Sequence, residues 1–82
     1  MDILSNLQGI FHDVFDDDSL VLTRKTSFED IEEWDSLAQV SIVVSCESEF
    51  GIKFDLNEIV QLKNAGDIVD KVESKLRMSK IH

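Results

Sequence analysis

The sequence predicts an all-α protein, a four-helix bundle with a long loop between its first and second helices. Three features support this fold class. Apolar residues recur at helical spacing, residues with capping preferences stand before the apolar segments, and the 82 residues include no proline and only three glycines. A chain of this length is enough for one small core, so we expect a single domain over residues 1–82.

The first helix is expected over residues 3–15. Its apolar residues form a wide stripe at the period of an α-helix, at positions 3, 4, 7, 10, 11, 14 and 15. The helix should end at residues 16–18, because three successive acids are unfavourable at the negative end of a helix dipole. Residues 16–35 then form a long loop. Its apolar anchors are expected to be Leu20, Leu22, Phe28 and Ile31.

The second helix is expected over residues 36–50, with Asp35 as its N-cap and Gly51 as its C-terminal stop. Residues 41–44 have some strand propensity, but the cap, the length and the glycine stop favour a helix. A helical wheel places Ser36 outside the side that meets the core. That core side contains Gln39, Ile42, Val43, Cys46 and Phe50.

Two further helices are expected in the C-terminal third of the chain. Asp55 and Glu58 have the spacing of a capping box, which predicts a third helix over residues 56–62. Asn64 is the expected N-cap of a fourth helix over residues 65–77. The apolar face of this last helix consists of Ala65, Ile68, Val69, Val72 and Leu76.

The charge of the chain limits its partners. The formal net charge is -9, and residues 1–50 contain twelve of the acids against only Arg24 and Lys25. Nucleic-acid binding needs a basic surface, so we expect no nucleic-acid partner. A field of this sign attracts basic protein surfaces instead. No segment approaches the roughly 20 apolar residues that span a bilayer.

The compartment follows from cysteine usage and from the N-terminus. The single cysteine cannot form an internal disulfide, which favours a reducing environment. The first residues lack the basic opening of a signal peptide. We therefore expect a cytoplasmic protein, and a monomer.

Ser36 is the candidate functional residue. Because Asp35 already serves as the helix cap, the Ser36 hydroxyl is left free on the first turn. A catalytic serine needs a base nearby, but His12 and His82 are both remote in sequence and no nucleophile-elbow motif is present. The position favours covalent attachment over catalysis, although a serine that merely begins a helix is the simpler alternative.

Three other features are assigned structural roles. The acids at 16–18 lack the central glycine of a calcium loop, where Val21 stands instead, so no metal site is expected. Cys46 is expected to be a small core residue. Trp34 either packs onto the core or flanks the serine for a partner, and its large area favours packing.

Four sequence segments together resemble the acyl carrier protein family. They are Asp35-Ser36-Leu37, Glu47-x-Glu49-Phe50-Gly51-Ile52, Glu58-Ile59 and Gly66-Asp67-Ile68-Val69. The resemblance covers about residues 3–77. It implies a non-catalytic four-helix bundle whose serine receives 4′-phosphopantetheine from coenzyme A through a phosphopantetheinyl transferase. The thiol of that arm then holds an acyl group as a thioester for acyl-loading and acyl-processing enzymes.

The resemblance also implies roles for individual residues. Ser36 is the attachment site, and Asp35 and Leu37 complete the recognition motif. The surface offered to basic docking patches of partner enzymes consists of Val40, Val44, Glu47 and Glu49.

The pathway is left open by three departures from the family pattern. Trp34, before the Asp-Ser-Leu triplet, is less typical of carriers of fatty-acid synthesis. Ala38 and Ser41 stand where carriers of fatty-acid synthesis usually have acids. The resemblance therefore implies a cargo that is an acyl intermediate of fatty-acid, polyketide or related biosynthesis, or alternatively an aminoacyl or peptidyl group. A non-carrier acidic helical interaction module is the alternative from a different class.

Overall fold

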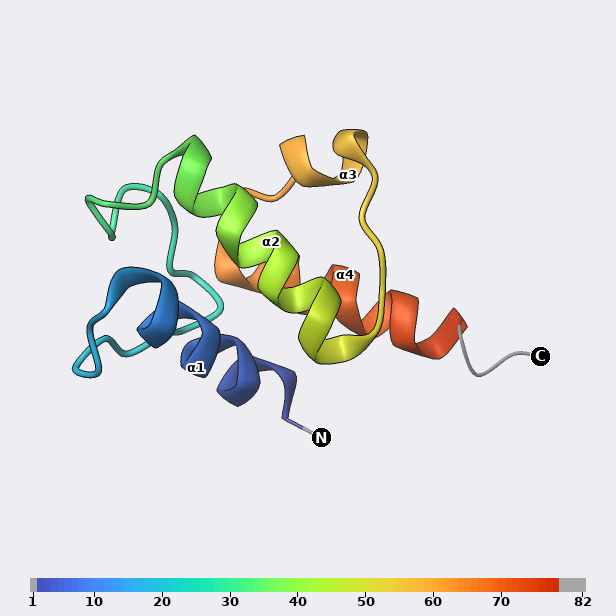
Figure 1. Ribbon diagram of the computed structural model, residues 1–82, viewed down its shortest axis with the longest axis horizontal. Coiled ribbons are helices and arrows are strands. Elements are labelled where there is room, and N and C mark those ends of the chain that lie inside the picture. The colour runs from blue at the N-terminus through green and yellow to red at the C-terminus, as the bar shows by residue number, and fades with distance from the viewer. Residues whose placement is uncertain (1, 79–82) are drawn as a thin grey trace.

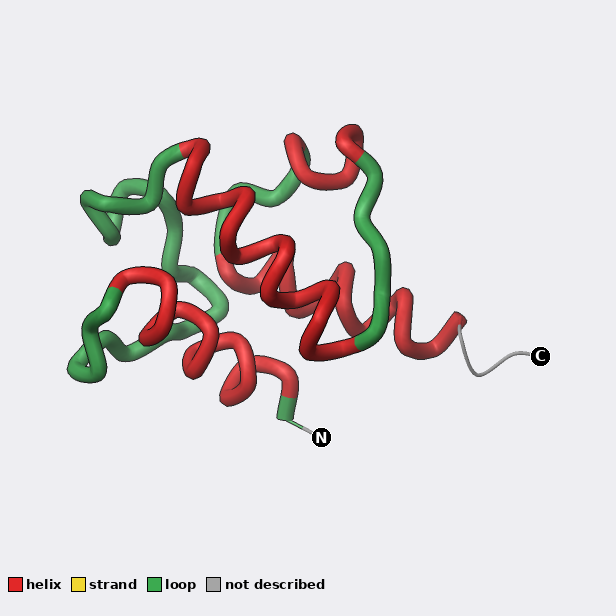
Figure 2. The backbone as a smooth tube through the Cα atoms, viewed as in Figure 1, coloured by secondary structure: helices red, strands yellow, loops and turns green. Residues whose placement is uncertain are grey.

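The computed structural model describes residues 2–78, and within that range the chain forms four α-helices (Figure 1). They are α1 (Ile3–Phe15), α2 (Ser36–Phe50), α3 (Leu56–Val60) and α4 (Ala65–Met78). Figure 2 shows the long connection between α1 and α2, residues 16–35, as a loop throughout. The predicted all-α class and the long loop are confirmed, and residues 41–44 are helical rather than extended.

The core lies between α1, α2 and α4. Helix α1 packs against both α2 and α4, and α2 also contacts α4. In the view of Figure 1, α1 and α3 lie on opposite sides of α2. The largest fully buried side chains all come from the three packed helices: Leu7, Phe11, Ile42, Cys46, Ile68 and Val72. Their burial contributes to the hydrophobic stabilisation of the fold.

Local capping sets most of the helix boundaries. Asp35 Oδ1 accepts the Ala38 amide at 2.9 Å, and Asn64 Oδ1 accepts the Asp67 amide at 2.8 Å. Gly51 ends α2 in the left-handed region at φ 66°. Each of these caps agrees with the sequence prediction. Helix α1 ends in the same way at Asp16, which has φ 50°. The end of α1 therefore has two causes, this left-handed cap and the unfavourable position of the acids at the negative end of the helix dipole.

Helix α3 is shorter than the predicted range of 56–62. It ends at Val60, because the Gln61 and Leu62 amides bond to carbonyls only three residues back, both at 3.2 Å. This tighter turn carries Leu62 into the core, where its side chain is buried. Helix α4 extends one residue beyond the predicted end, to Met78.

Hydrogen bonds tie the long loop to α1 and to α4. The Leu22 amide donates to Gln8 Oε1 of α1 at 2.8 Å. The Arg24 carbonyl accepts the Gly66 amide of α4 at 2.8 Å. Of the expected anchors, Leu22 and Ile31 are buried, Leu20 is half-buried and Phe28 is exposed. These ties hold the first half of the loop in place, between α1 and α4.

Trp34 joins the loop to the core. Its ring meets the Phe11 ring edge-on, with centroids 5.0 Å apart, and Phe28 covers it at 4.7 Å. The predicted packing role of Trp34 is confirmed, since its side chain is buried. The tryptophan therefore stabilises the segment that leads into Ser36.

Candidate functional site

Ser36 is the first residue of α2, and it is exposed. The cap of the helix is the neighbouring Asp35, whose carboxylate is occupied by the Ala38 amide. Over residues 2–78, no group hydrogen-bonds to the Ser36 hydroxyl. The local geometry therefore leaves one accessible oxygen at the positive end of a helix dipole.

A stripe of exposed apolar side chains follows Ser36 along α2. Leu37 is 77% exposed, Val40 53% and Val44 56%. Large apolar residues that a helix leaves in solvent are typical of a surface that binds another molecule. The structure therefore brings three of the predicted recognition and docking residues onto one surface beside the serine.

The two predicted docking acids differ in their surroundings. Glu47 is half-buried, and its Oε2 accepts the Phe54 amide at 2.9 Å, so it also holds the connection between α2 and α3. Glu49 is exposed on the side of α2 that faces α1, where it borders a hollow together with Gly9 and Asp13. Helical spacing places Glu47, but not Glu49, beside Val40 and Val44.

A cavity of about 360 Å³ lies beside the serine, between α2 and α3. Its lining is largely apolar and includes the serine itself: Phe28, Ser36, Gln39, Val40, Ile59, Val60, Leu62 and Lys63. Gln39 was predicted to lie on the core side of the second helix, with no part in the site. The signal that points to it is a polar residue on an otherwise apolar helix face.

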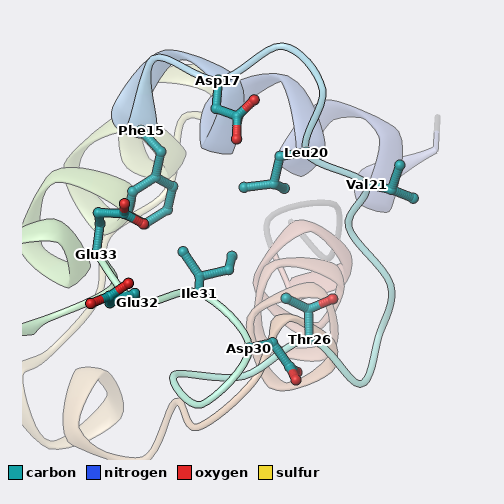
Figure 3. A pocket seen from close by; sticks show the side chains of 9 residues that line it. All are labelled: Phe15, Asp17, Leu20, Val21, Thr26, Asp30, Ile31, Glu32 and Glu33. Atoms are coloured by element: carbon teal, nitrogen blue, oxygen red, sulfur yellow. The ribbon is translucent and has the colours of Figure 1, made fainter.

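A second hollow, of about 300 Å³, lies between the end of α1 and the loop (Figure 3). Its floor includes Phe15, Leu20 and Ile31, and four carboxylates belong to its lining: Asp17, Asp30, Glu32 and Glu33. All of its residues come from α1 and the loop, so it is separate from the cavity beside Ser36. It adds to the negative field around the start of α2.

The remaining reactive side chains are used within the fold. The His12 Nε2 lies 2.7 Å from the Leu20 carbonyl, which fastens the loop to α1. Burial, assisted by the nearby Glu47 and Glu49 carboxylates, raises the pKa of the Cys46 thiol to about 12. Among residues 2–78, no cluster of histidine, cysteine and acidic side chains has an arrangement that could bind a metal ion. His82 lies outside the described residues.

Comparison with known proteins identifies the family of the chain. Residues 5–72 match the family described as the phosphopantetheine attachment site. The acyl carrier protein of Thermotoga maritima is 33% identical over 75 residues, which cover 92% of this chain and 93% of the relative. The chain belongs to the acyl carrier protein family. An acyl carrier protein homolog of Mycoplasma genitalium is 45% identical over 60 residues, 71% of each chain.

A solved structure agrees with this assignment. The solution structure of a holo acyl carrier protein from Geobacter metallireducens matches with a TM-score of 0.88 and 51% identity, covering 100% of this chain and 95% of that one. The chain is thus an acyl carrier protein with a phosphopantetheine attachment site, and it is a carrier rather than an enzyme. In the part of the carrier that the structure describes, no helix combines the length and apolarity needed to cross a membrane.

Proposed function

We propose that Ser36 is the residue that carries the 4′-phosphopantetheine arm, with Asp35 and Leu37 completing the motif that the transferase recognises. The observation that carries this proposal is the exposed hydroxyl at the first residue of α2, without a hydrogen-bond partner among residues 2–78. Asp35 takes over the capping of the helix, so modification of Ser36 does not remove a cap. The serine also lies inside the matched range, residues 5–72.

The surroundings of Ser36 fit a phosphate ester. A phosphate there lies at the positive end of the α2 dipole, near backbone amides that lack helical partners. When bound, the arm supplies a terminal thiol that holds the acyl group as a thioester. Ser36 anchors that arm, and α2 presents it next to the exposed stripe of Leu37, Val40 and Val44. The arm is a short tether. Once one of several enzymes has docked on the carrier, the cargo reaches that enzyme within the same complex, at a high effective concentration.

The partners that fit this surface are a phosphopantetheinyl transferase and acyl-loading and acyl-processing enzymes with basic docking patches. Val40 and Val44 supply an apolar centre with Glu47 beside it, and Glu49 adds negative charge on the side of α2 that faces α1. Docking through surface charges is fast and weak, and salt screens it. A transferase whose kcat/KM for this carrier is the same at low and high salt would contradict this docking mode.

The cargo that best fits the site is an acyl chain of fatty-acid, polyketide or related biosynthesis. The support for it is the largely apolar cavity of about 360 Å³ that includes Ser36 in its lining. An aminoacyl or peptidyl cargo is the second candidate, and it gains no specific support from this lining. We further propose that residues 1–82 form one monomeric domain that works in the cytoplasm.

The attachment proposal is tested by incubation with coenzyme A and a broad-specificity transferase, followed by intact mass measurement. We expect one phosphopantetheine adduct on the native chain and none on Ser36→Ala. Ser41→Ala is the matched control, because Ser41 is also exposed on α2 and should leave the adduct unchanged. An adduct on Ser36→Ala, or none on the native chain, would contradict the proposal.

A further inference from the structure

Lys63 is the only charged residue in the lining of the cavity beside Ser36. It follows the buried Leu62 in the connection between α3 and α4, which Figure 1 shows beside the first half of α2. The other lining residues are apolar apart from Ser36 and Gln39. No carboxylate therefore borders this cavity, although the half of the chain that contains Ser36 is strongly acidic.

The ammonium group of Lys63 is available to a ligand. Within residues 2–78 it forms no ion pair, whereas Lys71 and Lys75 of α4 share a carboxylate of α3. The backbone of Lys63 is held by the fold, because its amide donates to Asp67 Oδ2 at 3.0 Å. The fold thus fixes where this lysine begins, while its flexible stem leaves the ammonium group free to turn.

We propose that the Lys63 ammonium group pairs with the phosphate of the arm on Ser36 and holds the base of the arm beside this cavity. The proposal rests on Ser36 being the attachment site. Because the phosphorus atom is bonded to the Ser36 oxygen, the phosphate stays at the cavity that Lys63 also lines. The phosphodiester adds negative charge to a chain whose net charge is already -9. A cation at the same cavity offsets part of that repulsion.

The pairing acts on the first bonds of the arm. It directs the base of the arm toward the connection between α3 and α4, and away from the acids of the loop that precedes α2. Lys63 is thus a positioning residue, since it contacts the phosphate and not the thiol that holds the cargo. Its side chain is exposed, so the pair should be modest in strength and should weaken as salt is added.

The test attaches the arm to the full chain with coenzyme A and a broad-specificity transferase, and intact mass verifies the product. The midpoint of thermal unfolding is measured at low salt before and after attachment, in the native chain and in Lys63→Gln. The change caused by attachment should be less favourable in Lys63→Gln, by about 1–6 °C. Comparing the change within each variant removes any effect of the substitution on the unmodified fold.

Two further variants act as controls. Lys53→Gln removes the same charge from an exposed lysine in the connection between α2 and α3, outside the lining of the cavity. Attachment should therefore change its midpoint as in the native chain. Lys63→Arg keeps the positive charge and should also behave like the native chain.

Phosphorus NMR of the attached arm gives a second readout. The phosphate signal should move in Lys63→Gln but not in Lys53→Gln. The difference should shrink at about 1 M salt, where charges are screened beyond about 3 Å. If Lys63→Gln does not fold, the native chain still decides, because attachment should shift the NMR signals of the Lys63 side chain more than those of Lys53.

The possible results separate the two proposals. A chain that carries the arm on Ser36 but shows the same midpoint change and the same phosphate signal in Lys63→Gln and Lys53→Gln overturns the role of Lys63 alone. So do native Lys63 signals that do not respond to attachment. A chain that cannot receive the arm at Ser36 overturns the attachment site and the role of Lys63 together.

Discussion

Gly66 is a residue whose missing side chain lets two segments approach each other. Its amide donates to the Arg24 carbonyl at 2.8 Å, which fastens the long loop to the start of α4. A Cβ at this position would lie 2.8 Å from the same carbonyl oxygen and 3.3 Å from Asn64 Oδ1. The backbone oxygen cannot move without loosening the loop.

We expect Gly66→Ala to lower the free energy of unfolding by about 1–3 kcal/mol, because the loop must shift away from α4. The measurement is urea unfolding followed by circular dichroism. Gly9→Ala is the matched control, since a Cβ there would meet nothing within 4 Å. Inside α1, that change should instead stabilise the protein by about 0.5–1 kcal/mol. Equal stability of the two variants would show that the loop is not tightly held.

Cys46 illustrates how burial alone changes the chemistry of a residue. Its side chain is 0% exposed, and burial raises the pKa of its thiol to about 12. Because the thiolate is the reactive form, the folded protein should offer almost no reactive Cys46 near neutral pH. The arm of the modified carrier then has the accessible thiol, and Cys46 does not compete for acyl groups.

We expect thiol reagents to modify Cys46 far more slowly in the folded protein than in urea at pH 8. The raised pKa also has a consequence for stability. The contribution of the neutral thiol is complete below the ordinary pKa of 9.0 and is lost as the pH rises toward about 12. Cys46→Ala should remove that alkaline loss. Rapid modification of the folded chain would mean that the α2 side of the core opens readily.

At the scale of elements, one acidic side chain of α3 ties this helix to α4. Glu58 Oε1 accepts the Asp55 amide at 2.8 Å and lies 2.8 Å from Lys75 Nζ of α4, while Lys71 Nζ lies 3.7 Å from Oε2. Helix α3 has no buried residue of its own. Since α3 forms one wall of the cavity beside Ser36, the contacts of Glu58 also stabilise that wall.

We expect Glu58→Ala to speed hydrogen exchange of the α3 amides and to lower the free energy of unfolding by about 1 kcal/mol, through loss of the capping box. Glu58→Gln keeps an acceptor for the Asp55 amide, so it should have the smaller effect. Exchange in α1 serves as the internal control. Unchanged exchange in α3 of Glu58→Ala would mean that other contacts hold the helix.

The contacts of Glu58 also predict that the stability of the fold depends on pH. The Asp55 amide, followed by the Lys75 ammonium, lowers the pKa of Glu58 below its usual 4.5. The stabilisation is therefore present above the ordinary pKa and is lost as the pH falls through the lowered folded-state value. We expect acid to weaken the attachment of α3 to α4 in the native chain. In Glu58→Gln, where position 58 no longer titrates, this acid-induced change should be absent.

At the scale of the whole molecule, the uneven charge is the dominant feature. The net charge of -9 arises almost entirely from residues 1–50. Several of these acids line the hollow of Figure 3, and others stand near the start of α2. Repulsion among them opposes the compact state, and the exposed Arg24–Asp70 pair offsets little of it.

We expect the midpoint of thermal unfolding to rise as salt is added up to about 0.15 M, where charges are screened beyond about 8 Å. Sodium chloride and choline chloride at equal ionic strength provide the comparison. Screening predicts the same rise with both salts. A rise with sodium alone would point to specific ion binding and would contradict the repulsion argument.

Much of the fold was predictable because its signals are local. The caps Asp35, Asn64 and Gly51 depend on groups within four residues, so the sequence was sufficient to place the starts of α2 and α4 and the end of α2. The exposed position of Ser36 follows from the same local rules. The family resemblance, later confirmed, added the carrier function.

Other features depend on residues that meet only when the chain is folded. The loop is tied by contacts between Leu22 and Gln8 and between Arg24 and Gly66. The early end of α3 serves the burial of Leu62, which the helical pattern of its own segment cannot reveal. Nor does spacing indicate that Gln39 pairs with Trp34 and leaves its amide nitrogen buried and unpaired. Capping and periodicity act over a few residues, whereas cavities and buried donors arise from segments brought together by packing.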